Sequence, residues 1–600
     1  MGTIVRSAGI GSVRDGLRLA WNADRKRFLI TASLAILAAL LPAATLLLVR
    51  DLVNAIFDSP GTGSVLLACL IAVVIALTLS IQTMTLPVRE ALTVRVALEA
   101  EQRLVRAVAA TPFQRFDEPA WHDRLARAKG DLDWRPTQVT DSSLQVLGGC
   151  AGLIGILGVI VSTQPVLAVL AVLAVVPVVI TRRLITSRLL TVWRETTSQT
   201  RRQEYLRTML TSRESAAEVR AYGLARHFTA EHRELGEHVA QRTTTLVRRT
   251  AGQGILVTLP IAIGCLGVAF VLLVRAAEAG TVTPGDVAVL AAAVIAFATE
   301  LSGLGDGILE LIEHGLFLDD YFTLLASAPN PADEDGTARP PVKTAVAPTT
   351  PPLIEIDDVW FRYPETDRYV LRGVTLRVEP GTVLALVGDN GAGKSSLVKL
   401  LLGFYTPTRG SIRFGGVDLN DIDHTTLLQS VGVVFQSYPR YPFDLRTNIA
   451  LGRPDDSIDD ERVITALRSG GAMDISDRLP LGLDTMLSKE FNDGTDLSGG
   501  EWQRIALARL MYRDPCMWIL DEPTAALDPL AELAIFERWR ETLNGRTGIL
   551  ISHRFSTTRT ADHVALIANG QVLEHGSHDD LLTKKSRYAE LFNAQAEGYR

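Results

Sequence analysis

A glycine-rich segment at residues 388–396 has the composition and spacing of a phosphate-binding loop. It reads Gly388-Asp389-Asn390-Gly391-Ala392-Gly393-Lys394-Ser395-Ser396, after the strand-like run VLALV (383–387) and before the apolar run 397–402. Glycines let backbone N–H groups converge on phosphate oxygens, and the following helix points its positive end at them. We expect Lys394 to bridge the β- and γ-phosphates of a nucleotide and Ser395 to offer its hydroxyl to Mg²⁺.

Two acids follow a second strand-like run. The sequence CMWIL (516–520) delivers Asp521 and Glu522 at its C-terminal end. An acid beside a phosphate loop can hold Mg²⁺ directly or through water, and we assign this role to Asp521. The second acid, Glu522, can polarise the attacking water as a general base. Pairs of acids after apolar strands are common, so this assignment depends on the phosphate loop nearby.

These residues need a soluble α/β domain to position them, and residues 353–600 have the composition of one, with a further strand expected over 353–361. A chain of 600 residues is too long for one hydrophobic core, so more domains are expected. The net charge of −7 does not favour a nucleic-acid binder. The four cysteines form no CxxC pair, and we expect small buried hydrophobes rather than disulfides or metal ligands.

The first half of the chain contains six apolar segments, and a helix needs roughly 20 such residues to cross a bilayer. They lie at 28–49, 64–87, 144–163, 166–180, 254–274 and 287–304. The fourth is short and is expected to extend past Arg182 and Arg183. Six such segments are too many to be buried in the core of a soluble domain. We therefore expect an all-α membrane domain of six helices over 28–327, preceded by an N-terminal segment at 1–27.

Basic residues gather on one side of the predicted spans, as is typical of cytosolic loops. They occur at 25–27, 89, 95, 182–183, 188 and 248–249, whereas the opposite loops carry only Arg50 and Arg275. The N-terminus and the domain after the sixth span are therefore expected in the cytosol. The first span is not interpreted as a signal peptide, because 27 residues precede it and further spans follow.

Two long charged segments, 88–143 and 186–253, read as cytosolic helical extensions of the spans. As hairpins with limbs of ~27 residues, they would reach ~40 Å beyond the bilayer. Their tips are expected near 112–124 and 214–224. A separate soluble insert is the alternative, but neither segment has strand or turn signals of its own. A proline-rich stretch at 328–352 is interpreted as an extended linker to the α/β domain.

The order of further motifs resembles that of ATP-binding cassette (ABC) proteins, and with six preceding spans the chain resembles exporter-type half-transporters. The matching sequences are FRYP with Tyr363, VFQ with Gln436, LSGGE with Ser498, Gly499 and Gly500, DEPTAALD at 521–528, and SHR with His553. The resemblance implies that Tyr363 stacks on adenine, although it could be an ordinary strand aromatic. It also implies that Gln436 and His553 act with Glu522 in hydrolysis, and that Gln436 joins Ser395 and Asp521 around Mg²⁺.

The family further implies a dimer in which ATP lies between one subunit's phosphate loop and the other subunit's 498–500 segment. The tips at 112–124 and 214–224 resemble coupling helices that seat on the cassettes, with 431–451 forming much of the receiving surface. This chain has Glu501 where the family more often has glutamine. We do not interpret Glu501 as inactivating, because Ser498 and both glycines are intact.

We therefore expect an ATP-hydrolysing primary active transporter of a bacterial plasma membrane. Its expected cargo is hydrophobic or amphipathic, such as a peptide, lipid or drug-like natural product, because the spans carry few charges. A homodimer embedded in lipid is the favoured assembly, and no nucleic-acid partner is expected. Three alternatives stay open: an obligate heterodimer with a second half-transporter, an importer on an exporter-like scaffold of the siderophore type, and a non-pumping ATP-gated channel or regulator.

Glu300 lies near the inner end of the sixth predicted span. An acid in this place could face a substrate path, since ionisable residues inside membranes are costly and usually functional. It could also lie at the membrane boundary, which is the interpretation that the sequence favours.

Overall fold

The computed structural model describes the chain apart from Met1 and residues 59–60, 131, 133, 328–347, 365, 455, 492, 524–544, 553–557, 585 and 598–600. By its contacts the chain divides into two compact units. The first unit comprises residues 1–111 and 119–331, and the second comprises residues 332–600 together with the short segment 112–118.

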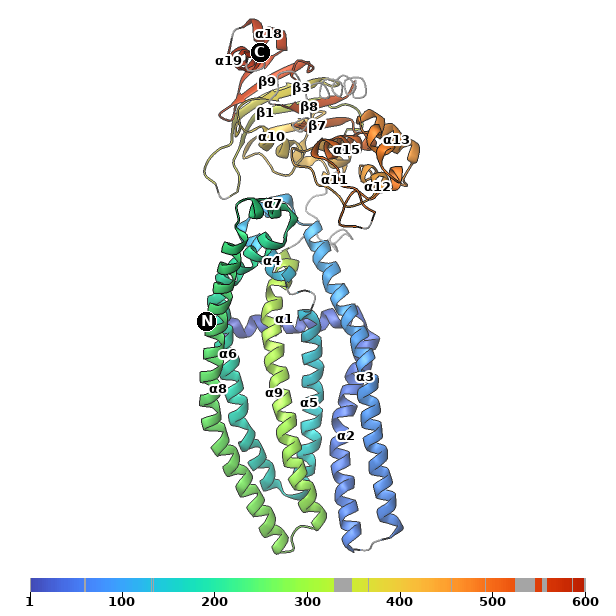
Figure 1. Cartoon of the computed structure of the whole chain (residues 1–600), viewed down its shortest axis with the longest axis vertical. Helices are drawn as coiled ribbons and strands as arrows, with labels where there is room; N and C mark the ends of the chain where they lie inside the picture. Colours follow the sequence, from blue (N-terminus) through green and yellow to red (C-terminus); the bar gives the residue numbers. More distant parts are fainter. Residues whose placement is uncertain are drawn as a thin grey trace. The chain divides into compact units, whose positions relative to one another are not determined.

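The first unit is helical. Its helices are α1 (Gly2–Ala23), α2 (Arg25–Asp58), α3 (Thr62–Ala109), α4 (Pro119–Gly130), α5 (Arg135–Thr163), α6 (Pro165–Thr211), α7 (Arg213–Ala221), α8 (Ala225–Glu278) and α9 (Pro284–Ser327). The long helices run side by side, and α1 lies across them (Figure 1). The inner residues Leu19 and Ala20 of α1 are buried with Leu92 of α3 and Tyr321 of α9.

Five of these helices, α2, α3, α5, α8 and α9, are long and apolar enough to cross a membrane. Each contains one of the predicted spans. The remaining predicted span, at 166–180, lies in α6, in which Pro165–Ala174 is a shorter apolar stretch. Helix α6 then continues to Thr211, so the chain passes Arg182 and Arg183 without a break.

Small residues let α5 pack closely against α2. A Cβ placed on Gly148 would lie 3.4 Å from the backbone oxygen of Ala35, and one on Gly152 would lie 3.2 Å from that of Ala39. Interfaces between membrane helices use small residues in this way, because they allow the backbones to approach. On its other side α5 packs antiparallel to α9, where a Cβ on Gly149 would lie 3.3 Å from the Cβ of Leu304.

The helices break within the predicted tips of the two extensions. Between α3 and α4 the chain forms the 3₁₀ helix η1 (Phe113–Asp117), and proline at 112 and at 119 flanks it. Between α6 and α8 it forms the short helix α7. A proline has no N–H and fixes its own φ, which explains why the long helix α3 ends before Pro112.

The second unit contains two sheets. One has the order β2-β1-β4-β5, formed by β1 (Ile354–Phe361), β2 (Leu371–Val378), β4 (Arg409–Phe414) and β5 (Val417–Asp418). The other has the order β10-β9-β3-β8-β7-β6, formed by β3 (Val383–Val387), β6 (Val431–Val434), β7 (Met517–Asp521), β8 (Thr547–Ile551), β9 (His563–Ala568) and β10 (Gln571–Gly576). In the second sheet β6, β7, β8, β3 and β9 are parallel, and β10 is antiparallel to β9.

Helices surround these sheets. They are α10 (Lys394–Leu401), α11 (His424–Ser430), α12 (Leu445–Ala450), α13 (Asp460–Ser469), α14 (Met473–Arg478), α15 (Gly499–Arg513), α18 (His578–Thr583) and α19 (Arg587–Glu597), with 3₁₀ turns η3 (Leu419–Asp421) and η4 (Gly482–Asp484). Of the predicted linker, 328–347 lies outside the described residues. Pro348 and Pro352 belong to the second unit, where their carbonyls accept hydrogen bonds from Cys516 and Thr547.

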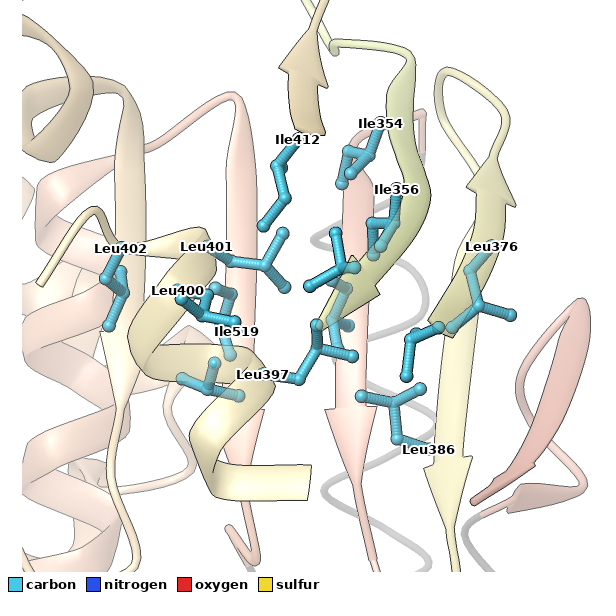
Figure 2. Close-up of a cluster of buried hydrophobic side chains, with 14 of the residues drawn as sticks. Ile354, Ile356, Leu376, Leu386, Leu397, Leu400, Leu401, Leu402, Ile412 and Ile519 are labelled. Atoms are coloured by element: carbon cyan, nitrogen blue, oxygen red, sulfur yellow. The ribbon is translucent and has the colours of Figure 1, made fainter. Parts of the chain in front are cut away.

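The core of the second unit holds α10 between the two sheets. Leu397, Leu400 and Leu401 of this helix point toward Ile354 and Ile356 of β1, Ile412 of β4, and Leu386 and Ile519 of the large sheet (Figure 2). All eight side chains are buried. Burial of each such side chain contributes about 1.5–3 kcal/mol. This packing fixes the N-terminus of α10 at the end of β3, which is the position that a phosphate loop requires.

Candidate nucleotide site

The segment between β3 and α10 adopts conformations that favour glycine. Gly388, Gly391 and Gly393 have φ values of 147°, 79° and 107°. A Cβ on Gly388 would lie 2.0 Å from the backbone oxygen of Ile567, so no larger residue fits there without a shift. Gly393 is the N-cap of α10, and its left-handed conformation turns the chain into the helix. The loop therefore has the shape expected from its sequence.

Lys394 folds back over this loop. Its ammonium donates hydrogen bonds to the backbone oxygens of Gly388, at 2.7 Å, and of Asp389, at 3.0 Å. Burial lowers the pKa of the ammonium, and the carboxylates of Glu522, Asp521 and Asp389 act in the opposite direction. These carbonyl bonds keep the positive charge inside the loop, where phosphate oxygens would replace the carbonyls as acceptors.

Because the strands are parallel, the acids at the end of β7 lie at the same edge of the sheet as the loop. Asp521 is the last residue of β7 and is buried; in the same sheet β6, next to β7, ends at Val434, and β3, on the other side of β8, ends at Val387. Ligands of open α/β sheets bind at this carboxyl edge. Gln436, two residues beyond β6, donates a hydrogen bond from Nε2 to the Glu522 carboxylate at 2.8 Å.

The backbone of Glu522 is in the left-handed region, with φ of 52°. Its N–H donates a hydrogen bond to the carbonyl of Ile551, the last residue of β8, at 3.0 Å. Gln503 of α15 donates from Nε2 to the Glu522 carbonyl at 3.4 Å. A non-glycine residue in this conformation is uncommon and strained, and such residues gather at functional sites. The strand end and α15 together hold the acid in place.

Tyr363 lies beside the phosphate-loop helix. Its hydroxyl is 2.9 Å from the hydroxyl of the buried Ser396, and its ring meets that of Tyr405 edge to face at 5.3 Å. The Lys399 ammonium lies 5.2 Å from the Tyr363 ring. In contrast to Ser396, the neighbouring Ser395 is exposed, as are Asp389, Asn390 and Gly391. The hydroxyl of Ser395 is therefore accessible to a ligand.

Ser498 caps the N-terminus of α15 in a capping box with Glu501. The Glu501 carboxylate accepts from the Ser498 N–H at 2.7 Å and from its hydroxyl at 2.9 Å. Arg478 of α14 forms an ion pair with the same carboxylate. Burial raises the pKa of Glu501, but the hydrogen bonds from Arg478 and Ser498 outweigh burial and hold the pKa below its ordinary value. Glu501 is therefore a structural cap.

We predict that Glu501→Gln preserves ATP hydrolysis while Glu501→Ala reduces it. Glutamine keeps an acceptor for the Ser498 N–H, so we expect a rate within about threefold of the wild type. Alanine removes the box, which costs about 1 kcal/mol of helix capping, and we expect a loss of about fivefold. ATPase assays of both variants, with Arg478→Ala as the control that breaks only the ion pair, test this. An Ala variant as active as the Gln variant would show that the cap is not needed.

The structure brings together the phosphate loop at 388–396, Gln436, Asp521 and Glu522, with Tyr363 beside the loop's helix. It does not join Ser498, Gly499 or Gly500 to this group: within the described part of the chain, no hydrogen bond links them to the loop. His553 lies outside the described residues. Sequence reasoning missed Gln503, Tyr405 and Arg478. Only the spacing of Gln503, five residues after Ser498 on α15, could have indicated that it reaches Glu522.

The segment 112–118 belongs to the same compact unit as this site. The Phe113 ring stacks on Phe404 with centroids 4.8 Å apart, and Asp117 accepts a hydrogen bond from the Tyr405 hydroxyl. Burial raises the pKa of Tyr405, and the bond to Asp117 raises it further. Because Tyr405 also contacts Tyr363, one aromatic cluster joins this segment to the expected adenine position.

Comparison with known proteins identifies relatives of this chain. The family model described as "ABC transporter" matches residues 371–525. The nisin transport ATP-binding protein NisT of Lactococcus lactis is 25% identical over 580 residues, which cover 96% of this chain and 95% of the relative. The ATP-dependent lipid A-core flippase of Alkalilimnicola ehrlichii is 39% identical over 249 residues, or 41% of each chain.

A solved structure gives the same result for the fold. A bacterial Atm1-family ABC exporter with ATP bound matches with a TM-score of 0.80 and 24% identity, over 96% of this chain and 99% of that one. The likeness therefore extends through both the helical unit and the unit with the sheets.

Proposed function

Because this chain belongs to the family of ABC transporters, we propose that it exports a hydrophobic or amphipathic substrate by alternating access. It is an ATPase coupled to transmembrane transport. One observation carries the proposal: a phosphate loop, its acids and a glutamine meet at one sheet edge in a chain that also has five helices able to span a membrane. Export rather than import is proposed because the fold of this chain matches that of a bacterial ABC exporter.

The residues at the sheet edge divide the chemistry between them. Lys394 and the loop N–H groups bind the phosphates, and Tyr363 stacks on the adenine. Ser395, Gln436 and Asp521 supply a hydroxyl, an amide and a carboxylate, which are the hard oxygen donors that Mg²⁺ prefers, so this donor set fits the ion. When bound there, Mg²⁺ neutralises charge on the β- and γ-phosphates. Glu522 accepts the proton of the attacking water, and Gln436 orients its carboxylate.

A second copy of the chain would complete the site. Ser498 caps α15 but is exposed on the surface, and among the described residues no hydrogen bond joins it to the phosphate loop of the same chain, so it is accessible to the ATP of a partner. A hydrophobic groove of about 360 Å³ opens on the same unit, lined in part by Phe404, Leu428, Phe435 and Tyr438. We propose that it receives the tip at 214–224 of the second copy. A heterodimer with another half-transporter would use the same surfaces, and the mass of the purified complex distinguishes the two.

The proposed location is a bacterial plasma membrane, with the N-terminus and the cassette on the cytosolic side. Two steps test the function. An ATPase screen in lipid nanodiscs first identifies the cargo that stimulates hydrolysis most. Transport of this cargo is then followed in sealed inside-out vesicles, where ATP-dependent accumulation is expected. Accumulation only in right-side-out vesicles would indicate an importer, and conductance without accumulation would indicate a channel.

We predict that Phe113→Ala weakens coupling between hydrolysis and transport. The variant loses the stacked contact with Phe404, and an aromatic pair contributes about 0.5–1.5 kcal/mol, which corresponds to about 2- to 10-fold. Cargo accumulated per ATP hydrolysed in vesicles should fall by this factor. Leu573→Ala, which alters an exposed apolar side chain of β10, serves as the control. An unchanged ratio in Phe113→Ala would mean that this segment does not transmit the motion.

A further inference from the structure

Glu300 stands out among the apolar segments of the chain. The six segments at 28–49, 64–87, 144–163, 166–180, 254–274 and 287–304 contain one charged residue, and it is Glu300. Charged residues inside membrane spans are rare because hydrocarbon does not solvate them. When they occur, they almost always face the bundle interior or a water-filled cavity and mark a substrate or ion path.

The structure places the Glu300 carboxylate where three helices meet. A Cβ on Gly152 of α5 would lie 3.3 Å from Oε2 of Glu300 and 3.2 Å from the backbone oxygen of Ala39 on α2. The absence of a side chain at Gly152 thus makes room for the carboxylate between α2, α5 and α9. Glu300 is partly exposed, so a ligand can reach it from one side.

This position is deep in the spans. Gly152 lies eight residues after Leu144 and eleven before Thr163, the ends of the third apolar segment. At 1.5 Å per residue these separations are about 12 Å and about 17 Å, which places the carboxylate near the middle of a hydrocarbon core of about 30 Å. The position beside Gly152 thus favours an intramembrane carboxylate, whereas the position along α9 alone, four residues before the end of the segment 287–304, favours the membrane boundary.

Several other acids of α9 form ion pairs or hydrogen bonds, and Glu300 differs from these. Asp286 forms an ion pair with Arg50 at 2.6 Å, Glu310 accepts from Ser142 at 3.2 Å, and Asp320 pairs with Arg127. Among the side chains that the structure describes, none forms a hydrogen bond or ion pair with the Glu300 carboxylate. A carboxylate without a counter-charge is unfavourable in an apolar medium. A ligand with a positive charge would remove this cost.

We propose that Glu300 binds the cationic group of the transported substrate, which is a hydrophobic or amphipathic cation. The proposal rests on the transport function above and adds the sign of charge that the cargo carries. The apolar walls of α2, α5 and α9 contact the hydrophobic part of the substrate, while the carboxylate pairs with its positive group. Glu300 thereby discriminates cationic from neutral substrates of the same shape.

Equilibrium binding to the full-length protein in lipid nanodiscs tests the proposal, without ATP. The probes are the tetraphenylphosphonium cation and uncharged triphenylphosphine. Glu300→Gln is expected to weaken binding of the cation at least about tenfold, as loss of a partly buried charge pair implies, and to leave the neutral probe unaffected. Glu300→Asp keeps the charge and should bind the cation better than the Gln variant. Glu278→Gln, at an exposed acid outside the spans, is the matched control and should bind as the wild type.

Basal ATPase activity and ATP affinity should be unchanged in all three variants, which shows that they fold. The proposal is overturned if Glu300→Gln binds the cation as tightly as the wild type, which would leave Glu300 as a proton site or a structural residue. Equal loss of both probes, or no binding of the cation to the wild type, overturns it too. Failure of the proposed transport function would give a different result: ATP-driven accumulation of the cargo would be absent, while binding of the probes would be intact.

Discussion

Glu522→Gln should lower the rate of ATP hydrolysis by about 10²- to 10⁴-fold, which is the usual contribution of a general base. The substitution replaces a proton acceptor by an amide of the same shape. Its side-chain oxygen can still accept the hydrogen bond that Gln436 donates in the wild type at 2.8 Å. ATP affinity should therefore stay within about threefold of the wild type, since no phosphate contact is lost. The variant should accumulate in an ATP-bound, closed dimer.

Turnover and nucleotide binding, measured separately on protein in nanodiscs, check this prediction. Glu379→Gln is the matched control, because it removes an exposed carboxylate that pairs with Arg377 on the surface. The control should hydrolyse ATP as the wild type does. If Glu522→Gln also turned over at the wild-type rate, another group would have to be the base.

The second large effect is expected from Lys394→Ala, which should weaken ATP binding about 10- to 100-fold. A hydrogen bond to a charged group contributes about 1.5–3 kcal/mol, and each 1.4 kcal/mol is tenfold in affinity. The structure shows the ammonium already inside the loop, bonded to the carbonyls of Gly388 and Asp389. The variant loses both these bonds and the phosphate contact, so hydrolysis at saturating ATP should fall as well.

Nucleotide affinity by fluorescence titration checks the second prediction. Lys584→Ala, at an exposed lysine after α18, removes one positive charge elsewhere on the same unit and should bind ATP normally. A thermal unfolding curve of Lys394→Ala without nucleotide separates loop damage from the lost contact. Unchanged ATP affinity would contradict the phosphate role of Lys394.

Local chemistry made much of this site predictable. Gly388, Gly391 and Gly393 have the left-handed or otherwise restricted conformations that only glycine adopts easily, so their spacing alone indicates the turn. The run 383–387 is β3 as predicted, and β7 at Met517–Asp521 is one residue from its predicted position. The apolar spans were predictable for a similar reason, since hydrocarbon requires long runs of apolar residues whatever their neighbours.

Contacts between distant segments were not predictable in this way. The bond between Gln436 and Glu522, 86 residues apart, depends on the pairing of β6 with β7. The aromatic cluster of Phe113, Phe404, Tyr405 and Tyr363 depends on which surface the segment 112–118 reaches. Neither contact leaves a periodic or compositional signal along the chain.

By itself the sequence determined the fold class, the number of apolar segments, the phosphate loop and the identity of the acids. Each of these depends on residues that are neighbours in the sequence, because backbone conformation and hydrophobicity act over a few positions. Only the tertiary structure decided the depth of Glu300, because α5 and α9 run antiparallel and set it beside Gly152. Strand order likewise decided which amide faces Glu522, since side chains from separate elements meet only when the core has packed.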